Sequence, residues 1–302
     1  MRRSGDWVRW LVRGSWAARA AANSPAVWEM ASSYVAGRKV VDAVDVAEGL
    51  RGKGLAVGFA HLSDRISETD TPRILESLLT SLADGAVGAE LSVKPSSIGL
   101  RDSLSEATAN LRELCRAAAA AGSHVTLEMQ RPGEYDATMQ LYRAVREDHP
   151  SLGITLPANL LRVETECRRL AADAARVRLC VGSYPVGRSV GHASEHEKAL
   201  ALVRCLRILM ESDAYPMLAT HDPRIIEIAQ DLAARMGREA DSFEFQLLLG
   251  VRPLEQRRLA DLGWLSRTYI PFGAGWYGYL ATRIAARPRT LWSYTRAVMD
   301  KR

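Results

Sequence analysis

Short apolar runs alternate with longer amphipathic segments along the chain from residue 55 onward. Apolar runs of a few residues are typical of buried strands, whereas apolar residues that recur every three or four positions indicate helices. Residues 103–122 and 195–212 are two of the stretches with helical spacing. The strands that this pattern predicts are residues 55–61, 89–94, 124–129, 152–158, 177–183, 215–221, 243–249 and 266–272.

Strands that alternate with helices are expected to pair in parallel, because each helix returns the chain to the same end of the sheet. Eight such pairs in about 250 residues predict closure into a (β/α)8 barrel, the TIM-barrel fold of the α/β class. A doubly wound open sheet is the alternative, but residues 37–54 contain glycines without the fingerprint G-x-G-x-x-G. We therefore predict a catalytic barrel over residues 55–302, preceded by an N-terminal helical segment over residues 1–54.

The composition is that of a globular protein with a sizeable core, with 47% hydrophobic and 25% charged residues. The net charge of +5 comes from 40 basic and 35 acidic residues spread along the chain. This balance argues against a nucleic-acid partner and is compatible with an anionic substrate or cofactor. No apolar run approaches the roughly 18 residues of a membrane-spanning helix.

The cysteines and the N-terminal residues bear on location. The four cysteines lie far apart without a C-x-x-C pair, so they suit neither zinc nor an iron–sulfur cluster, and reduced thiols predict a cytoplasmic protein. Residues 1–22 are rich in Arg and Trp. We expect a structural helix that packs on the barrel there, with peripheral contact to the inner face of the membrane as the alternative.

Polar side chains occur at the C-terminal ends of the predicted strands, where the active face of such a barrel lies. Because the strand ends of a closed barrel meet around one mouth, these side chains are expected to converge, and we predict a ligand site there. The residues are His61, Lys94, Glu128, Arg162, Thr220, His221, Asp222, Gln246 and Tyr269.

Lys94 is compatible with two chemistries. A desolvated lysine could form a Schiff base with a carbonyl substrate, whereas a protonated one could hold an anion. Metal-assisted hydrolysis is disfavoured, because a hydrolase barrel supplies several histidines and an acid to one ion, and His61 is followed by Leu62 and Ser63. We predict no metal site.

The segment after the last strand predicts a helix with an unusual face. Tyr279, Arg283 and Arg287 recur every four residues and so share one face, with Thr282 beside Arg283. An outer helix with solvated arginines is the simpler interpretation. Because aromatic residues crowd the same segment, we favour a helix that lies across the barrel mouth, where guanidinium groups could bind a carboxylate.

Residues 267–288, RTYIPFGAGWYGYLATRIAARP, resemble the C-terminal signature of the flavin-dependent proline dehydrogenase family. Other pieces agree in order, from YVAGRKVVDAV near residue 34 through ELSVKPSSIGL, VTLEM, LLR and YPMLATHD to FEFQLLLG. The likeness covers nearly the whole chain after the N-terminal helices. On these motifs the chain is identified as a divergent member of the monofunctional bacterial type.

The resemblance implies a distorted eight-stranded barrel that binds FAD at its strand C-termini and takes hydride from the carbon next to a secondary amine. It implies that Lys94 and Arg283 bind a substrate carboxylate and that Arg162 lies near flavin N5. It further implies a quinone or another diffusible electron acceptor and loose membrane association. By the same likeness Tyr269 and Tyr279 line the substrate pocket, and His221 and Gln246 help to hold the cofactor. To these we add Glu128 and Thr282 as predicted substrate-site residues, and Gly182 and Thr220 as predicted cofactor-site residues.

Several positions depart from the family pattern. Thr282 stands where the first of two paired arginines is expected, so half of the carboxylate clamp is absent. Glu128 replaces an aspartate, which keeps the charge but adds one methylene. The other departures are Pro157, Asn159 and Val181 near the expected flavin and Ala286 in the last helix. Because losing one partner of a buried charge pair costs about 2 to 5 kcal/mol, such changes can alter substrate preference.

The leading hypothesis is therefore an FAD-dependent dehydrogenase that oxidises the C–N bond of proline or a proline-like small amine to an imine, by hydride transfer to flavin N5. A different amine or a hydrazine from a specialised biosynthetic route is an alternative substrate. Two other functions stay open. One is a Schiff-base lyase or aldolase that works through Lys94, and the other is a barrel that binds a ligand or partner without turnover.

Overall fold

The structure is a computed structural model that describes residues 24–63, 70–184 and 186–286. Its helices are α3 (Pro25–Ala31), α4 (Val40–Arg51), α5 (Thr71–Leu82), α6 (Leu104–Ala120), α7 (Tyr135–Arg146), α8 (Val163–Ala172), α9 (Glu195–Met210), α10 (Pro223–Arg235), α11 (Pro253–Asp261) and α12 (Trp276–Ala286). Its strands are β1 (Ala56–His61), β2 (Glu90–Val93), β3 (His124–Leu127), β4 (Gly153–Pro157), β5 (Arg176–Cys180), β6 (Tyr215–Ala219), β7 (Glu244–Leu248) and β8 (Ser266–Phe272).

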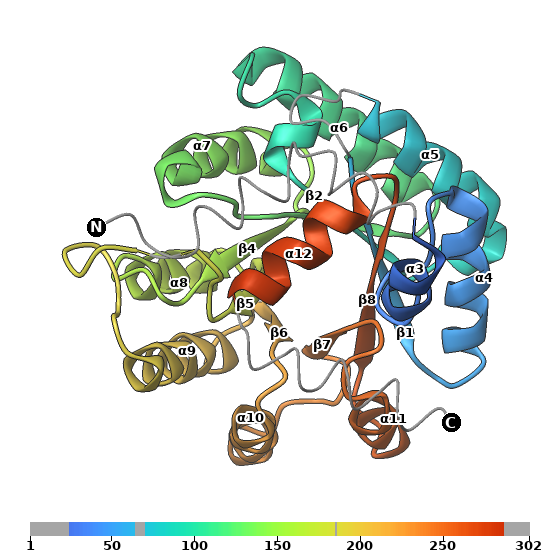
Figure 1. The fold of residues 1–302 in the computed structure, drawn as a ribbon. Coiled ribbons are helices and arrows are strands. Elements are labelled where there is room, and N and C mark those ends of the chain that lie inside the picture. Colours follow the sequence, from blue (N-terminus) through green and yellow to red (C-terminus); the bar gives the residue numbers. More distant parts are fainter. Residues whose placement is uncertain (1–23, 64–69, 185, 287–302) are drawn as a thin grey trace.

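The eight strands form a closed parallel barrel in chain order, which confirms the predicted fold class. All eight predicted strands are present, and the differences are confined to their ends. β8 closes the barrel against β1 over six residue pairs, from Ala56 opposite Arg267 to His61 opposite Phe272. Figure 1 shows the ring of helices around the barrel, which places all the strand C-termini at one mouth.

Helix α4 fills the place in the outer ring between β8 and β1, since it packs on both strands and on the neighbouring helix α5. That place would otherwise fall to the helix after β8. Helix α12 instead lies across the open end of the barrel (Figure 1). The expected division between residues 1–54 and 55–302 stays a prediction. The helix expected within residues 1–22 and the side chain of Arg287 lie outside the described residues.

The bend between β8 and α12 is made by glycines that touch another loop. Gly273 has a φ of +124°, which favours glycine, and a Cβ on Gly275 would lie 2.1 Å from the carbonyl oxygen of Ser63. The start of α12 is held by α3, because the rings of Trp28 and Trp276 meet edge to face with centroids 5.0 Å apart. These contacts direct α12 over the mouth.

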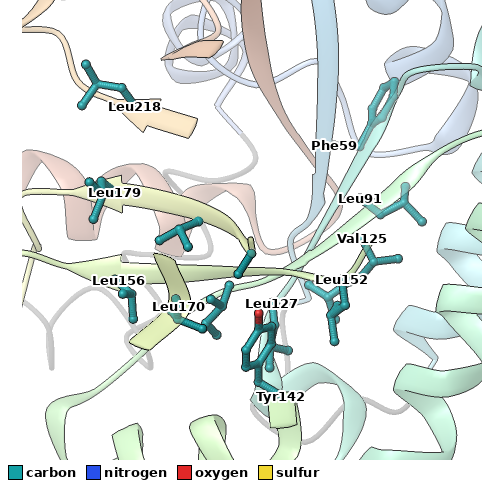
Figure 2. Packing of buried hydrophobic residues seen from close by; sticks show 14 of the residues in the cluster. Phe59, Leu91, Val125, Leu127, Tyr142, Leu152, Leu156, Leu170, Leu179 and Leu218 are labelled. Carbon is teal, nitrogen blue, oxygen red and sulfur yellow. The ribbon is translucent and has the colours of Figure 1, made fainter. Parts of the chain in front are cut away.

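The strands alternate between residues that face the helices and residues that face the barrel interior. The outward residues are mainly apolar and form one continuous core with the helices. Figure 2 shows part of this core, with Phe59, Leu91, Val125, Leu127, Leu156, Leu179 and Leu218 from the strands and Tyr142 and Leu170 from the helices. Among the described residues, the helices are too short or too polar to cross a membrane.

Candidate active site

The middle of the barrel interior holds two buried ion pairs. Arg178 on β5 pairs with Glu90 on β2, and Arg267 on β8 donates two hydrogen bonds to Glu244 on β7, at 2.7 and 2.9 Å. All four residues are at most 4% exposed. Burial acts to lower the pKa of each guanidinium, but the carboxylates outweigh it and raise the pKa of both arginines. The two cations therefore stay charged beneath the mouth.

Amide and hydroxyl groups join these ion pairs into one layer. The side-chain nitrogen of Gln246 donates to Glu244 and, at 3.3 Å, to Glu90. The hydroxyl of Thr126 donates to the other oxygen of Glu90 at 2.9 Å. Gln246, which the resemblance assigns to the cofactor, thus uses its amide nitrogen within the barrel interior, and these bonds leave its amide oxygen unused.

Glu128 follows β3 at the mouth and is tied to β2 and β8. Its Oε1 accepts hydrogen bonds from the Tyr269 hydroxyl at 2.6 Å and the Ser92 hydroxyl at 2.8 Å. Burial acts to raise the pKa of Glu128, but Lys94, Arg178 and the two hydroxyl donors outweigh it and hold that pKa below its usual value. Burial also raises the pKa of Tyr269 well above its usual value. The acid is therefore ionised and the phenol neutral.

Lys94 lies directly after β2 and faces the same space. Its ammonium nitrogen donates to the backbone carbonyl of His61 at 3.3 Å. Burial lowers the pKa of Lys94, Glu128 acts to raise it and Arg283 lowers it further, so both charged groups lie close to the lysine. The structure thus brings Lys94, Glu128, Tyr269 and Arg283 together, although they come from four different elements.

Helix α12 lies over these residues at the open end of the barrel (Figure 1). The guanidinium carbon of Arg283 lies 4.6 Å from the centre of the Tyr279 ring, so the two side chains stack as expected for a shared helix face. Tyr279 and Arg283 both affect the pKa of Tyr269, which places them next to it. Thr282 behaves differently, because its hydroxyl donates to the carbonyl of Gly278 at 2.7 Å and is used within the helix.

Arg162 lies apart from this cluster. It precedes α8 and pairs with Asp136 of α7 at 2.7 Å, and the two side chains are 51% and 81% exposed. Its guanidinium stacks on the ring of Tyr135, 4.3 Å from the ring centre. In this structure Arg162 therefore faces the outer rim, where an exposed ion pair contributes at most about 1 kcal/mol.

The other residues predicted for the cofactor, Gly182, Thr220 and His221, follow the ends of β5 and β6. His221 Nε2 accepts from the backbone nitrogen of Leu248 at 3.0 Å, and the Thr220 hydroxyl accepts from the Asp222 nitrogen at 3.2 Å. Gly182 has a φ of +91°, and a Cβ there would lie 2.3 Å from the amide oxygen of Asn159. His221, Thr220 and Gly182 are thus held in fixed positions in the loops that follow β5 and β6.

This side of the mouth is lined by small side chains. The inward positions at the ends of β4, β5 and β6 carry small residues, namely Pro157, Cys180 and Ala219, and Thr155 is the next inward residue below Pro157 on β4. The Thr155 hydroxyl is buried without a hydrogen-bond partner among the described residues, so a polar ring atom could use it. The hollow between the ends of β3, β4 and β5 measures about 40 Å³. The rim loops would therefore have to open for a tricyclic group, while the charged residues remain on the β2, β3 and β8 side.

Sequence reasoning missed the charged interior. Glu90, Arg178, Glu244 and Arg267 lie within segments whose pattern predicts only apolar strands. The available signal was their alternation with apolar neighbours, as in Arg176-Val177-Arg178 of β5. Alternating arginines on a strand whose outer face is covered by helices must point into the barrel, where they need acidic partners.

No family model matches the chain. Proline dehydrogenase 1 of Bacillus subtilis strain 168 is 30% identical over 275 residues, which cover 90% of this chain and 91% of that protein. Proline dehydrogenase 2 of the same organism is 26% identical, covering 86% of this chain and 88% of that protein. The proline dehydrogenase of Deinococcus radiodurans is also 26% identical, covering 87% and 88%.

Among solved structures, proline utilization A (PutA) from Bdellovibrio bacteriovorus, inactivated by N-propargylglycine, aligns with a TM-score of 0.77 and 20% sequence identity. The alignment covers 85% of this chain and 32% of that chain, so this protein spans about a third of the larger one. At this identity the likeness shows a shared barrel fold.

Proposed function

The chain belongs to the proline dehydrogenase family, and from this premise we propose that it oxidises the C–N bond of proline or a proline-like small amine to an imine. The observation that carries the proposal is the grouping of Lys94 and Arg283 with the Glu128–Tyr269 pair under α12. Two neighbouring cations suit the carboxylate of an amino acid.

The electrostatics of Lys94 support this assignment. Its pKa is lowered by burial and by the nearby cation of Arg283, because both effects disfavour the charged lysine. A substrate carboxylate between them would offset both effects and favour the protonated lysine. Lys94 and Arg283 would then fix the carboxylate end of the substrate, and the rings of Tyr269 and Tyr279 would bound its carbon atoms.

The amine must enter neutral, because its lone pair forms the new C=N bond as hydride leaves the adjacent carbon. Glu128 is ionised and has a lowered pKa, so it is a weak base and stabilises positive charge on the nitrogen instead. Tyr269 stays protonated and holds Glu128 in place. FAD, when bound, supplies the two-electron acceptor at N5.

We assign the cofactor to the β4–β6 side of the mouth. Thr220, His221, Gly182 and the oxygen of Gln246 would contact it. Arg162 would leave its exposed partner Asp136 at little cost and turn towards the flavin, where a cation offsets the negative charge that reduction adds. The acceptor for the reduced cofactor would be a quinone or another diffusible molecule, with at most peripheral membrane contact, and the four free cysteines suit a reducing cytoplasm.

Substrate choice depends on Thr282. Because its hydroxyl is bonded back to Gly278, α12 offers the carboxylate one guanidinium where the family pattern has two. A substrate with a smaller or displaced anionic group, including another amine or a hydrazine, would need only that one.

The test is anaerobic titration of the FAD-loaded protein with L-proline and a panel of cyclic amines and hydrazines. Bleaching of the flavin absorbance by proline or one of these amines is the expected result. Protein that remains colourless after FAD is supplied would contradict the proposal. Bound FAD that no amine reduces would instead indicate a barrel that binds without turnover.

The buried position and lowered pKa of Lys94 also suit a Schiff-base lyase or aldolase. Borohydride reduction in the presence of candidate carbonyl compounds would label Lys94 in that case. Failure to form any adduct while amines bleach the flavin would decide for the dehydrogenase.

A further inference from the structure

A second hollow lies at the opposite end of the barrel from the candidate active site. It is a cavity of about 390 Å³ at the N-terminal ends of the strands. Its polar lining comes from Arg51 of α4, His124 of β3, Arg176 of β5, Tyr215 of β6 and Arg267 of β8. The lining contains no Asp or Glu among the described residues.

The basic side chains around this cavity have unused donors. Arg51 gives one terminal nitrogen to the carbonyl of Val87 at 2.9 Å, and the guanidinium of Arg176 stacks 4.1 Å from the centre of the Tyr215 ring. The Nε atoms of both arginines and Nδ1 of His124 are buried without a hydrogen-bond partner among the described residues. Buried donors of this kind are costly unless a ligand or water satisfies them.

The charges are also unbalanced. Arg267 is paired with Glu244, whose charge also acts on Arg176 from the interior, but within the described part of the chain the lining itself offers no acid to Arg51 or Arg176. Burial and Arg267 lower the pKa of Arg51. Burial, Arg176 and Arg267 also lower the pKa of His124, although Glu90 and Glu244 oppose them from the interior. An anion in the cavity would offset this repulsion.

We propose that this cavity binds a small oxyanion, held by the guanidinium groups of Arg51 and Arg176 with His124 as a third donor. Inorganic phosphate is smaller than the cavity, so an organic phosphate or a polycarboxylate would fill it better. The cavity lining shares no residue with the proposed dehydrogenase centre, which lies at the opposite ends of the strands. The site is therefore separate from the proposed dehydrogenase centre and does not depend on it.

Binding can be measured on the full chain without an activity assay. Thermal unfolding with inorganic phosphate, glycerol phosphate or citrate should show a rise in melting temperature of about 2–4 °C over chloride at equal ionic strength. The three anions distinguish a simple phosphate, an organic phosphate and a polycarboxylate. Arg176→Gln should abolish the rise, whereas the control Arg235→Gln, on the exposed face of α10, should keep it.

If Arg176→Gln does not fold, the unmodified protein supplies the second measurement. Saturating anion should raise the pKa of His124, followed by the proton NMR signals of its ring, and at constant pH should leave the ring signals of exposed His196 in place. An equal temperature rise in Arg176→Gln and Arg235→Gln, or a His124 pKa that no anion moves, would overturn the proposal.

Discussion

The hydroxyl of Tyr269 lies 2.6 Å from Oε1 of Glu128 and donates a hydrogen bond to it. The same oxygen accepts from Ser92, whose hydroxyl in turn accepts from Arg178 at 2.6 Å. The phenol at the mouth is thereby connected to the ion pair of Arg178 and Glu90 inside the barrel. Such a chain fixes the Tyr269 ring before any substrate arrives, which reduces the ordering cost of binding.

Tyr269→Phe tests whether Tyr269 acts on the reaction or only on the stability of the barrel. Losing a hydrogen bond to a charged group should cost about 1.5–3 kcal/mol of unfolding free energy, measured by urea unfolding. The rate of flavin reduction by substrate should fall about tenfold or more. Tyr215→Phe is the control, because it loses a similar bond to Glu244 at the other end of the barrel. Equal losses of reduction rate in the two variants would show that Tyr269 acts only through stability.

Thr282→Arg should restore the second guanidinium of the carboxylate clamp. We expect the KM for proline to fall by about tenfold, which corresponds to about 1.4 kcal/mol, because a charge-assisted hydrogen bond replaces a hydroxyl that is bonded to Gly278. Thr282→Ala serves as the control, since it removes the bond to Gly278 without adding a cation. If Thr282→Arg leaves KM for proline unchanged while an amine without a carboxylate is oxidised faster, the missing arginine does not set selectivity.

The Glu244–Arg267 pair predicts a defined loss of stability in acid. Burial acts to raise the pKa of Glu244, but Arg267 outweighs it and holds that pKa at about 2 in the folded protein, against 4.5 for the free side chain. The stabilisation, on the order of 3 kcal/mol, is complete above about pH 4.5 and is lost as pH falls towards 2. Urea unfolding between pH 7 and pH 2.5 should therefore show a steep fall below pH 4.5.

In Glu244→Gln the loss of unfolding free energy below pH 4.5 that comes from Glu244 should be absent. The variant should also be about 3–5 kcal/mol less stable at pH 7, because Arg267 is left buried without its charge partner. Exposed Glu211, which pairs with Arg207 on the surface, supplies the control Glu211→Gln. The same acid profile in Glu244→Gln and the unmodified protein would show that other carboxylates dominate.

The barrel could be predicted from the sequence because the strand side chains that face the surrounding helices are apolar. Residues such as Leu91 and Leu179 must face the helices, so each strand appears as a short apolar run. The interior could not be predicted in the same way, since the partner of Arg178 lies 88 positions away and depends on barrel closure. The role of α4 was missed for a similar reason, because no local pattern shows that it replaces the helix after β8. The orientation of the Arg162 side chain depends on its ion pair with Asp136, which lies in the first turn of another helix, α7.

The pair of Arg162 and Asp136 predicts how the cofactor is bound. If Arg162 leaves Asp136 to contact the flavin, Arg162→Gln should weaken FAD binding about tenfold, as measured by quenching of flavin fluorescence. Asp136→Asn should not weaken FAD binding, since it only releases the arginine, and its stability should change by less than about 0.5 kcal/mol. Arg168→Gln, which breaks the exposed pair with Glu164 on the same side of the barrel, is the control and should behave like the unmodified protein. An equal weakening by Asp136→Asn and Arg162→Gln would mean that the intact ion pair holds the rim, and that the guanidinium itself does not contact the cofactor.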